Sequence, residues 1–461
     1  MNAIPKVNTI VCIGAGYVGG PTMAVIADHC PGVRVVVLDS NPERIAQWNS
    51  GRLPIFEPGL EAVVERCRGR NLFFEVSAPA PIAEADIVFV SVNTPTKEFG
   101  EGAGMAPDLR YWEQAARFIQ PHLKDGAIVV EKSTVPVRTA EAISRILHLE
   151  SGGRHFPVLS NPEFLAEGTA IRDLESPDRV LIGCEDDDAG RAAAQALAGV
   201  YRNWVPPERI VLSSVWSSEL SKLVANAFLA QRISSINAVS ALCEATQADI
   251  TEISRAVGTD RRIGLAFLES GVGFGGSCFR KDILSLSYLC QQQGLPEAAA
   301  YWRSVVEMND HQINRFARNI VERQFNTVAG KKLAIFGFAF KPGTNDTRDA
   351  PAQYVCKKLL EEQAHLAIHD PQALDNARHD LRGLEGNIAF EHDPYRAAQG
   401  AHAVVLITHW EEYRKLDYRR IHQSMEKPAS FFDGRNWLDS AELHRIGFNV
   451  YPIGKTPLIH E

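Results

Sequence analysis

Features that mark membrane, secreted or zinc-binding proteins are missing from this sequence. Its 461 residues hold no apolar run close to the roughly 20 residues that span a bilayer. The N-terminus leads directly into an expected strand and lacks the apolar core of a secretory signal. The eight cysteines are scattered without a Cys-x-x-Cys pair, which argues against a disulfide framework or a zinc site. These absences predict a cytoplasmic protein with reduced thiols, no membrane segment and no metal.

Excess positive charge is also missing. Lys and Arg number 48 against 56 Asp and Glu, which gives a net charge of -8. This balance argues against nucleic acid as a partner, yet it permits an anionic small molecule held by a few local cations. The length predicts two to four domains, and the ordinary hydrophobic content predicts a large buried core.

Short apolar runs alternate with helical patterns in the first part of the chain. Strands are expected at 9–13 and 33–38, with a helix at 21–28 between them, and further strands at 86–92 and 127–131. Such alternation is typical of a doubly wound α/β domain.

A second series of the same kind begins with a strand at 332–337. A helix is expected at 351–362, and strands are expected at 365–369, 403–408 and 430–433. The turn after its first strand lacks a three-glycine pattern, so we expect no second dinucleotide there.

Residues 215–242 between the two series contain neither Pro nor Gly. They predict one helix of about 28 residues, roughly 42 Å long. We therefore predict an α/β protein with two Rossmann-like doubly wound domains, 1–213 and 326–461. A long central helix and a helical dimerisation region, 214–325, would join them.

A glycine-rich turn follows the first strand. Gly14, Gly16 and Gly19 stand between an expected strand and helix, where a helix N-terminus can hold a pyrophosphate. Asp39 ends the second strand, at the position where a carboxylate binds the ribose hydroxyls and repels a 2′-phosphate. The pattern predicts a site for NAD rather than NADP. Glycines present for packing alone are the alternative.

One cysteine differs from the others in its surroundings. Cys278 follows the glycine-rich stretch 273–276 and precedes Arg280, Lys281 and Asp282. Glycines leave the sulfur unshielded, and nearby cations favour the nucleophilic thiolate. Beside an NAD site, such a thiol would capture an aldehyde for a second oxidation. The remaining cysteines are expected to be structural, and apolar patterns place three of them in the core: Cys12, Cys243 and Cys356.

Three polar segments are ambiguous from the residues alone. Lys222 and Asn226 share one face of the long helix, but a solvated Lys and an ordinary polar Asn would give the same pattern. Segment 160–168 is either a site or a helix start with carboxylates near its N-terminus. Segment 131–136 lies at the sheet edge where ligands gather, or is a simple turn.

Several cations are ambiguous in the same way. Each is an ordinary surface residue when taken singly, but together they would hold a pyrophosphate, which arginine recognises through two hydrogen bonds. They are Lys341, Arg348, Arg262 and Arg435.

Six strings in a fixed order resemble the nucleotide-sugar dehydrogenases of the UDP-glucose/GDP-mannose dehydrogenase family, over nearly the whole chain. The strings are GAGYVG (14–19), VNTPT (92–96), KSTVPVR (132–138), NPEFLAEG (161–168), GFGGSCF (273–279) and FAFK (338–341). The fourth and fifth look most like the UDP-glucose branch. The resemblance implies conversion of UDP-glucose to UDP-glucuronate with two NAD+. It implies two hydride transfers, a thiohemiacetal and a thioester on Cys278, and a final hydrolysis.

The resemblance also implies a role for each matching residue. The catalytic residues would be Cys278, Lys222, Asp282, Glu163, Thr134 and Asn226. NAD would be bound by Gly14, Gly16, Tyr17, Val18, Gly19, Asp39, Arg44, Thr94, Thr134, Glu167, Lys281 and Arg348. UDP-glucose would be bound by Glu163, Phe164, Leu165, Lys222, Asn226, Arg262, Phe267, Phe274, Gly275, Cys278, Phe279, Phe340, Lys341 and Arg435. Arg262 would reach the substrate of a neighbouring subunit in a homodimer, or in a hexamer built from dimers.

One departure and several alternatives stand beside this resemblance. Glu269 occupies a position where animal members carry Lys, which would put an acid near the pyrophosphate. UDP-N-acetylmannosamine and GDP-mannose dehydrogenases share the fold, the thiol and the double oxidation. A β-hydroxyacid type dehydrogenase performs one hydride transfer and needs no thiol, so Cys278 argues against it. A catalytically silent NAD-binding protein would not need the complete set of chemical residues.

Overall fold

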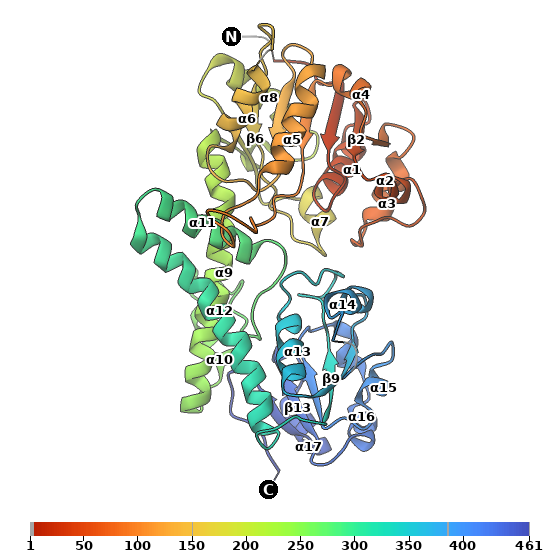
Figure 1. Cartoon of the computed structure of the whole chain (residues 1–461), viewed down its shortest axis with the longest axis vertical. Coiled ribbons are helices and arrows are strands. Elements are labelled where there is room, and N and C mark those ends of the chain that lie inside the picture. The colour runs from red at the N-terminus through yellow and green to blue at the C-terminus, as the bar shows by residue number, and fades with distance from the viewer. Residues whose placement is uncertain (1–3, 150, 385–386, 461) are drawn as a thin grey trace. The chain divides into compact units, whose positions relative to one another are not determined.

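The computed structural model describes residues 4–149, 151–384 and 387–460. Its packing divides the chain into two compact units, 1–225 and 226–461. The boundary falls within one long helix, α9 (Val215–Thr246), which is labelled in Figure 1. Each unit contains a mainly parallel sheet with helices on both faces, which confirms the predicted fold class. The finer division into three domains stays a prediction.

Among the described residues, the first unit forms an eight-stranded sheet in the order β3-β2-β1-β4-β5-β6-β7-β8. Neighbouring strands are parallel except β6 and β7. The first six strands have the order of a dinucleotide-binding Rossmann sheet. The strands are β1 (Thr9–Ile13), β2 (Arg34–Asp39), β3 (Leu72–Val76), β4 (Ile87–Val90), β5 (Ile128–Glu131), β6 (Val158–Ser160), β7 (Val180–Cys184) and β8 (Ile210–Ser214).

Alternating strand residues supply two separate cores, because successive side chains point to opposite faces. In β1, Ile10 and Cys12 belong to the core beneath α1, α3 and α8, whereas Val11 and Ile13 belong to the core beneath α5 and α6. Burial on both faces explains why these strands read as continuous apolar runs. The helices are α1 (Gly19–His29), α2 (Pro42–Trp48), α3 (Leu60–Cys67), α4 (Pro79–Glu84), α5 (Arg110–Ile119), α6 (Thr139–His148), α7 (Ala170–Glu175) and α8 (Asp188–Tyr201), with short 3-10 turns at Gln120–His122 and Pro207–Arg209.

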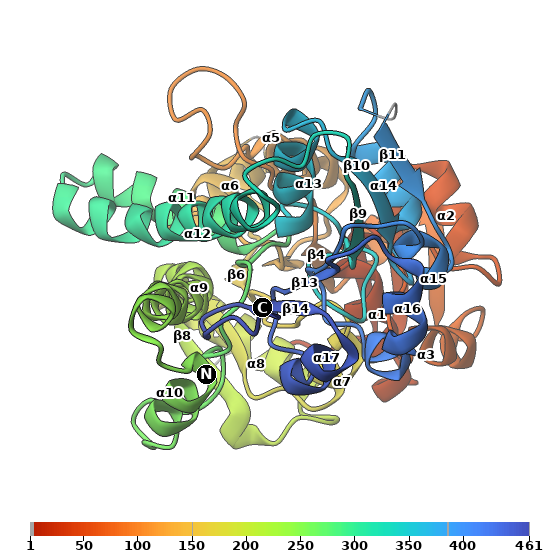
Figure 2. The same cartoon turned by 90° about the horizontal axis from the view of Figure 1, so that it is seen from below.

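The second unit begins with helices and continues into its own sheet. Helices α11 and α12 lie side by side (Figure 2). The described part of this sheet has six parallel strands in the order β11-β10-β9-β12-β13-β14. Its strands are β9 (Lys332–Phe336), β10 (His365–His369), β11 (Ile388–Phe390), β12 (Ala403–Leu406), β13 (Ser430–Asp433) and β14 (Asn449–Pro452). Its helices are α10 (Ile250–Gly258), α11 (Phe279–Gln292), α12 (Pro296–Arg323), α13 (Pro351–Glu361), α14 (Leu374–Asp380), α15 (Pro394–Ala398), α16 (Tyr418–Ser424) and α17 (Ser440–Ile446), with a 3-10 turn at Glu411–Lys415.

The predicted elements are confirmed with small shifts at their ends. The long helix continues beyond residue 242 to Thr246 and ends before Gln247, whose φ of 60° is left-handed. The first helix begins at Gly19 rather than Pro21, because the glycine turn leads into it directly. None of the described helices is both long and apolar enough to cross a membrane.

The three cysteines expected in the core are buried. Cys12, Cys243 and Cys356 are at most 1% exposed. Burial raises the pKa of the Cys12 and Cys356 thiols well above the usual value, so both remain protonated and unreactive. This confirms their structural role.

The second strand of each sheet leads into a buried aspartate with different hydrogen bonds. Asp39 accepts the backbone N–H groups of Ala15 and Asn41, each at 2.9 Å. Asp370 accepts the N–H groups of Phe338 and Ala339 at 2.7 and 3.0 Å. Asp370 accepts three further hydrogen bonds, from the N–H groups of Gln372 and Ala373 and from the indole of Trp410. Since a carboxylate offers about four lone-pair sites, Asp370 is saturated by the protein, and it serves the fold rather than a ligand.

Substitution Asp370→Ala should therefore lower the Tm by several degrees. Five donors would lose their acceptor, and a buried unsatisfied donor costs about 1–3 kcal/mol. Asp375→Ala is the control, because that carboxylate is 92% exposed and pairs only with Arg378 among the ion pairs of the described residues. Thermal unfolding of both variants tests this. Equal Tm values for the two variants would show that Asp370 does not hold the turn.

Candidate active site

The glycine turn after β1 contains glycines of two kinds. Gly14 has φ of 107°, and a Cβ there would lie 2.2 Å from the carbonyl oxygen of Ser91. A Cβ on Gly19 would lie 2.1 Å from the carbonyl oxygen of Gly14. A Cβ on Gly16 would meet nothing within 4 Å. Packing therefore explains Gly14 and Gly19 but not Gly16, which leaves the start of α1 open to a ligand.

Asp39 ends β2 beside this turn and is 7% exposed. Its Oδ2 lies 3.1 Å from Nη1 of Arg44, and Arg44 belongs to the first turn of α2, which Asn41 caps. The carboxylate is thus fixed by backbone N–H groups on one side and by a cation on the other. This geometry suits a fixed ribose acceptor, as predicted, and places Arg44 at the same edge.

The expected cofactor residues Tyr17 and Val18 lie in the same turn and are partly exposed. Thr94 follows β4, is 3% exposed, and donates its hydroxyl to the carbonyl oxygen of Thr134 at 2.9 Å. The segments after β4 and β5 are therefore bonded to each other at the sheet edge. Glu167 is half-buried just before α7. The NAD contacts of these residues stay predictions.

A buried ion pair holds Glu163. Its Oε2 lies 2.7 Å from Nζ of Lys132, a side chain that is 4% exposed. Its Oε1 accepts the N–H groups of Phe164 and Leu165 at 2.8 and 3.0 Å. Burial acts to raise the pKa of Glu163, but Lys132 and the two N–H groups outweigh it and keep that pKa below the usual value. Glu163 is thus a fixed carboxylate at neutral pH.

Lys132 contacts the predicted site residue Glu163, although no role was predicted for Lys132 itself. Besides Glu163, its Nζ donates to Oδ1 of Asn161 at 3.2 Å, and the hydroxyl of Tyr201 donates to the same oxygen at 2.6 Å. A cavity of about 20 Å³ adjoins this network, a size that suits one water molecule. The available signal was the position of Lys132 at the carboxyl end of a parallel strand, inside the KSTVPVR string.

The ring of Phe164 lies beside two cations. The guanidinium carbon of Arg179 is 3.8 Å from the ring centroid, and Nζ of Lys222 is 5.2 Å from it. Lys222 is 7% exposed, so the solvated-lysine alternative is wrong. The first unit therefore brings the Glu163 segment and Lys222 together through Phe164.

Cys278 lies in the second unit and is exposed, unlike the three core cysteines. It is the N-cap residue of α11, where the helix dipole favours negative charge. Its Sγ is 3.4 Å from the hydroxyl of Ser277. The expected contribution of Arg280 stays a prediction, and its guanidinium makes a bidentate pair with Asp310 at 2.6 and 2.8 Å. The helix N-terminus was missed in the sequence reasoning, which considered only neighbouring charges.

One helical turn beyond Cys278, Asp282 is 2% exposed. Its Oδ2 accepts a hydrogen bond of 2.6 Å from the side-chain amide of Asn226. Nζ of Lys281 is 3.8 Å from its Oδ1. Asn226 is 6% exposed, which argues against an ordinary surface Asn. Three predicted site residues thus meet next to the Cys278 turn.

The loop before Cys278 packs closely against the turn that carries Phe340. A Cβ on Gly276, whose φ is 89°, would lie 2.9 Å from the ring of Phe340. A Cβ on Gly275 would lie 2.4 Å from the carbonyl oxygen of Asp349. The glycines therefore permit this close approach, a role that the sequence interpretation did not include.

Aromatic rings surround the same loop. The rings of Phe274 and Phe279 meet edge to face at 5.7 Å, and the ring of Phe267 lies 6.5 Å from that of Phe279. Nζ of Lys341 lies 5.4 Å from the ring of Phe340. These predicted substrate residues are therefore clustered within the second unit.

Arg435 is a partly buried cation beside the Cys278 loop. Its guanidinium donates to the carbonyl oxygens of Ile407 at 2.7 Å and Gly273 at 3.3 Å. Burial lowers the pKa of Arg435 to about 10, and the charges of Glu269 and Asp433 oppose this shift. Because carbonyl groups carry no net charge, these hydrogen bonds leave the cation able to attract an anion. The charge of Glu269 acts on Arg435 itself.

Two other predicted cations are held by carboxylates close in sequence. Arg262 is 88% exposed and pairs with Asp260 at 2.6 Å. Arg348 pairs with Asp346. A role toward a neighbouring subunit or NAD remains a prediction for both. Among the catalytic candidates, Thr134, Glu163 and Lys222 belong to the first unit, and Cys278, Asn226 and Asp282 to the second.

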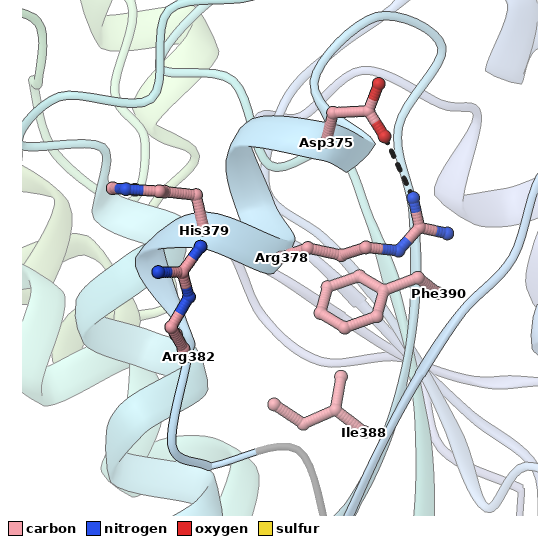
Figure 3. A pocket seen from close by; sticks show the side chains of 6 residues that line it. All are labelled: Asp375, Arg378, His379, Arg382, Ile388 and Phe390. Carbon is pink, nitrogen blue, oxygen red and sulfur yellow. Dashed lines mark hydrogen bonds and ion pairs between the residues drawn. The ribbon is translucent and has the colours of Figure 1, made fainter.

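A surface pocket at the β11 edge of the second sheet contains none of the predicted residues (Figure 3). Arg378 in this pocket pairs with Asp375 at 2.9 Å and lies over the ring of Phe390 at 5.2 Å. Arg382 and Ile388 complete the wall with His379. Its principal cation is thus satisfied locally.

Comparison with protein-family models matches most of the chain. Residues 8–205 match the NAD binding domain of the UDP-glucose/GDP-mannose dehydrogenase family. Residues 216–311 match the central domain of that family, and residues 334–440 match its UDP binding domain.

Curated relatives are similar over nearly the full length. UDP-glucose 6-dehydrogenase 1 of Arabidopsis thaliana is 57% identical over 97% of both chains. UDP-glucose 6-dehydrogenase 2 of Oryza sativa subsp. japonica is 57% identical over 98% of both.

Solved structures agree with these relatives. A UDP-glucose dehydrogenase from Pyrobaculum islandicum superposes with a TM-score of 0.85 at 33% identity and 99% coverage of both chains. A UDP-D-ManNAc dehydrogenase from Pyrococcus horikoshii gives 0.83 at 26% identity, covering 97% of this chain and 99% of that one.

Two glycine substitutions separate packing from cofactor binding. Gly19→Ala should lower the Tm, because its Cβ would overlap a carbonyl oxygen. Gly16→Ala should keep the Tm and weaken NAD binding by about tenfold or more, because its Cβ would stand where the pyrophosphate approaches α1. Thermal unfolding without ligand and calorimetric titration with NAD measure the two effects. Unaltered NAD affinity in Gly16→Ala would mean that this turn does not carry the pyrophosphate.

Proposed function

Because the chain belongs to the UDP-glucose/GDP-mannose dehydrogenase family, we propose that it oxidises UDP-glucose to UDP-glucuronate with two NAD+. One observation carries the choice of sugar, namely 57% identity to a plant UDP-glucose 6-dehydrogenase over 97% of both chains. The exposed thiol at the start of α11 supports the double oxidation.

The reaction proceeds in two oxidations on one enzyme. Bound NAD supplies the hydride acceptor for each of them. In the first, a base removes the C6 hydroxyl proton as the hydride leaves, and Cys278 Sγ adds to the resulting aldehyde. This thiohemiacetal keeps the aldehyde on the protein. In the second, loss of a hydride and of the hydroxyl proton gives a thioester, which water cleaves to the acid and the free thiol.

Lys222 and Asn226 stabilise the negative oxygen that develops in each tetrahedral species. The hydrogen bond from Asn226 to Asp282 supports this role, because it orients the amide beside the Cys278 turn. Losing one oxyanion donor typically lowers the rate by about 10²–10³. Asp282 and Lys222 assist proton transfer.

Glu163 and Thr134 position the water that cleaves the thioester. The fixed, ionised state of Glu163 supports this role, since an ionised carboxylate can only accept hydrogen bonds and would orient a water molecule through its protons. Lys132 maintains that state through the 2.7 Å ion pair.

The cofactor and the sugar nucleotide use the residues assigned from the sequence. Gly16 and Asp39 hold the pyrophosphate and ribose of NAD, with the turn and edge residues Gly14, Tyr17, Val18, Gly19, Arg44, Thr94, Thr134, Glu167, Lys281 and Arg348. Arg435 and Lys341 hold the UDP diphosphate. The remaining substrate contacts come from Glu163, Phe164, Leu165, Phe267, Phe274, Gly275, Phe279, Phe340 and the neighbouring subunit's copy of Arg262.

The protein acts as a homodimer, or as a hexamer built from dimers, in the cytoplasm. Exposed apolar side chains on α9 support self-association, since Phe228 and Leu242 are 55% and 61% exposed. All eight cysteines are free, which supports a reducing compartment.

Cys278→Ser should retain binding of NAD and UDP-glucose and lose net formation of UDP-glucuronate, because an alcohol is a much poorer nucleophile than a thiolate. The parent enzyme should form two NADH per UDP-glucose consumed, measured by absorbance at limiting sugar with analysis of the product. Cys290→Ser, a half-buried cysteine on the same helix, is the control and should keep its turnover.

Three outcomes would contradict parts of the proposal. Normal turnover by Cys278→Ser would exclude the covalent route. One NADH per sugar in the parent enzyme would mean release of an aldehyde. Turnover only with UDP-N-acetylmannosamine or GDP-mannose would keep the mechanism and change the substrate.

A further inference from the structure

Glu131, at the end of β5, is a buried acid without a donor. Its side chain is 1% exposed, and neither carboxyl oxygen receives a hydrogen bond from the described residues. Burying an ionised carboxylate without donors is very costly, and such a group takes up a proton instead. The geometry therefore requires a neutral carboxyl group at this position.

The protonated carboxyl group of Glu131 donates a hydrogen bond to Glu219, which lies in the second turn of α9. Glu219 is 2% exposed. Its two oxygens accept the N–H groups of Arg138 at 2.7 Å and Ala140 at 2.8 Å. Since these N–H groups stand at the N-terminus of α6, where negative charge is favoured, Glu219 is the ionised member of the pair.

Electrostatics agree with this assignment. Burial, the charge of Glu219 and a side-chain hydrogen bond with it raise the pKa of Glu131 well above the usual value. Burial also raises the pKa of Glu219, but its backbone N–H partners and the hydrogen bond with Glu131 oppose that rise. Two carboxyl groups in contact cannot both ionise.

The cationic side chains near Glu131 contact other groups. Lys132 pairs with Glu163, the Arg138 guanidinium lies 4.9 Å from the ring centroid of Trp216, and Arg145 pairs with Glu141. None of these three contacts neutralises Glu131.

The N–H groups that Glu219 accepts belong to a constrained piece of backbone. Arg138 has φ of 75°, a left-handed conformation that is unfavourable for a residue with a side chain. It closes segment 132–138, which carries Thr134. Glu219 itself stands three residues before Lys222, so the two share one side of α9. Glu219 thus connects the Thr134 segment to the helix turn that carries Lys222.

We propose that Glu131 and Glu219 share a proton, and that this pair positions the Thr134 segment against the turn of α9 bearing Lys222. Both act as positioning residues through other groups and neither touches the substrate. The positioning part rests on the proposed function, which assigns Thr134 and Lys222 to the reaction. The shared proton does not depend on that assignment.

The shared proton is tested by stability in the absence of ligands. A carboxyl group with a raised pKa in the folded state contributes stability at low pH that is lost as the pH rises toward that pKa. In Glu131→Gln, an amide that does not titrate replaces this group and still donates to Glu219. This variant should gain Tm relative to the parent, and the gain should grow as the pH rises above the ordinary glutamate pKa of about 4.3. An equal pH dependence of Tm in both proteins would overturn the shared proton.

The positioning role is tested by kinetics. In Glu219→Gln, only one side-chain oxygen remains to accept the N–H groups of Arg138 and Ala140, each of which needs its own acceptor. We therefore expect kcat to fall by about tenfold or more while the KM for UDP-glucose changes little. Glu131→Ala should also lower kcat, and Glu131→Gln should restore most of it. Glu141→Gln is the matched control, because this half-buried acid in the first turn of α6 pairs with Arg145 and not with the Glu131–Glu219 pair, and it should behave as the parent.

Each result bears on one part of the proposal. A parental kcat in Glu219→Gln would overturn the positioning role. If Glu219→Gln does not fold, the comparison of Glu131→Ala with Glu131→Gln decides instead, and equal kcat values for those two would overturn it. The pH dependence of Tm involves no substrate, so its failure is distinguishable from a failure of the covalent mechanism at Cys278.

Discussion

The ion pair between Lys132 and Glu163 is the constraint on which the first unit's part of the site depends. Both side chains are almost fully buried, and removing one partner from such a pair typically destabilises a protein by about 3–5 kcal/mol. The pair lies where β5 and β6 end, and it orders both following segments. In the loop after β6, the second carboxylate oxygen of Glu163 accepts the backbone N–H groups of Phe164 and Leu165. Phe164 then contacts Lys222, so an electrostatic requirement of the sheet edge also arranges candidate catalytic groups.

Side chains alternate between the two faces of the sheet along β5 and at the residue that follows it, so the carboxyl end of this strand contacts elements on both faces. Glu131 and Lys132 are consecutive, so their side chains leave the backbone on opposite sides. Lys132 reaches the segment after β6, and Glu131 reaches α9 through Glu219. An acidic and a basic residue that are adjacent in sequence thus connect the end of one strand to two separate elements. A slip of one residue in register would exchange both partners, so the register of β5 is strongly specified.

The fold was largely predictable because its signals are local. Apolar runs and turn residues placed β10 and β13 at their observed bounds, and the absence of Pro and Gly defined α9 to within four residues of its end. Glycines in a strand-turn-helix context indicated the cofactor turn. What could not be predicted were partners far apart in sequence. Arg280 pairs with Asp310 across two helices, so its charge could not be assigned to Cys278 by proximity. Glu131 and Glu219 are 88 residues apart in the sequence, and neither has a distinctive local pattern.

The two sheets show how one architecture serves different ligands. Each begins with a central strand followed by a turn, and in each the neighbouring strand leads to an aspartate that accepts backbone N–H groups from that turn. In the first unit, the neighbouring Gly16 leaves space at the start of α1. In the second unit, the carboxylate of Asp370 accepts hydrogen bonds from two residues of the turn, two residues after β10 and one indole, so no lone pair remains for a ligand. The aspartate that would hold a ribose in the first sheet therefore fixes the turn in the second. That turn continues to Phe340, which packs against the Cys278 loop. The second sheet thus has no free carboxylate acceptor at this turn, and the turn instead supports the loop of Cys278, the proposed nucleophile.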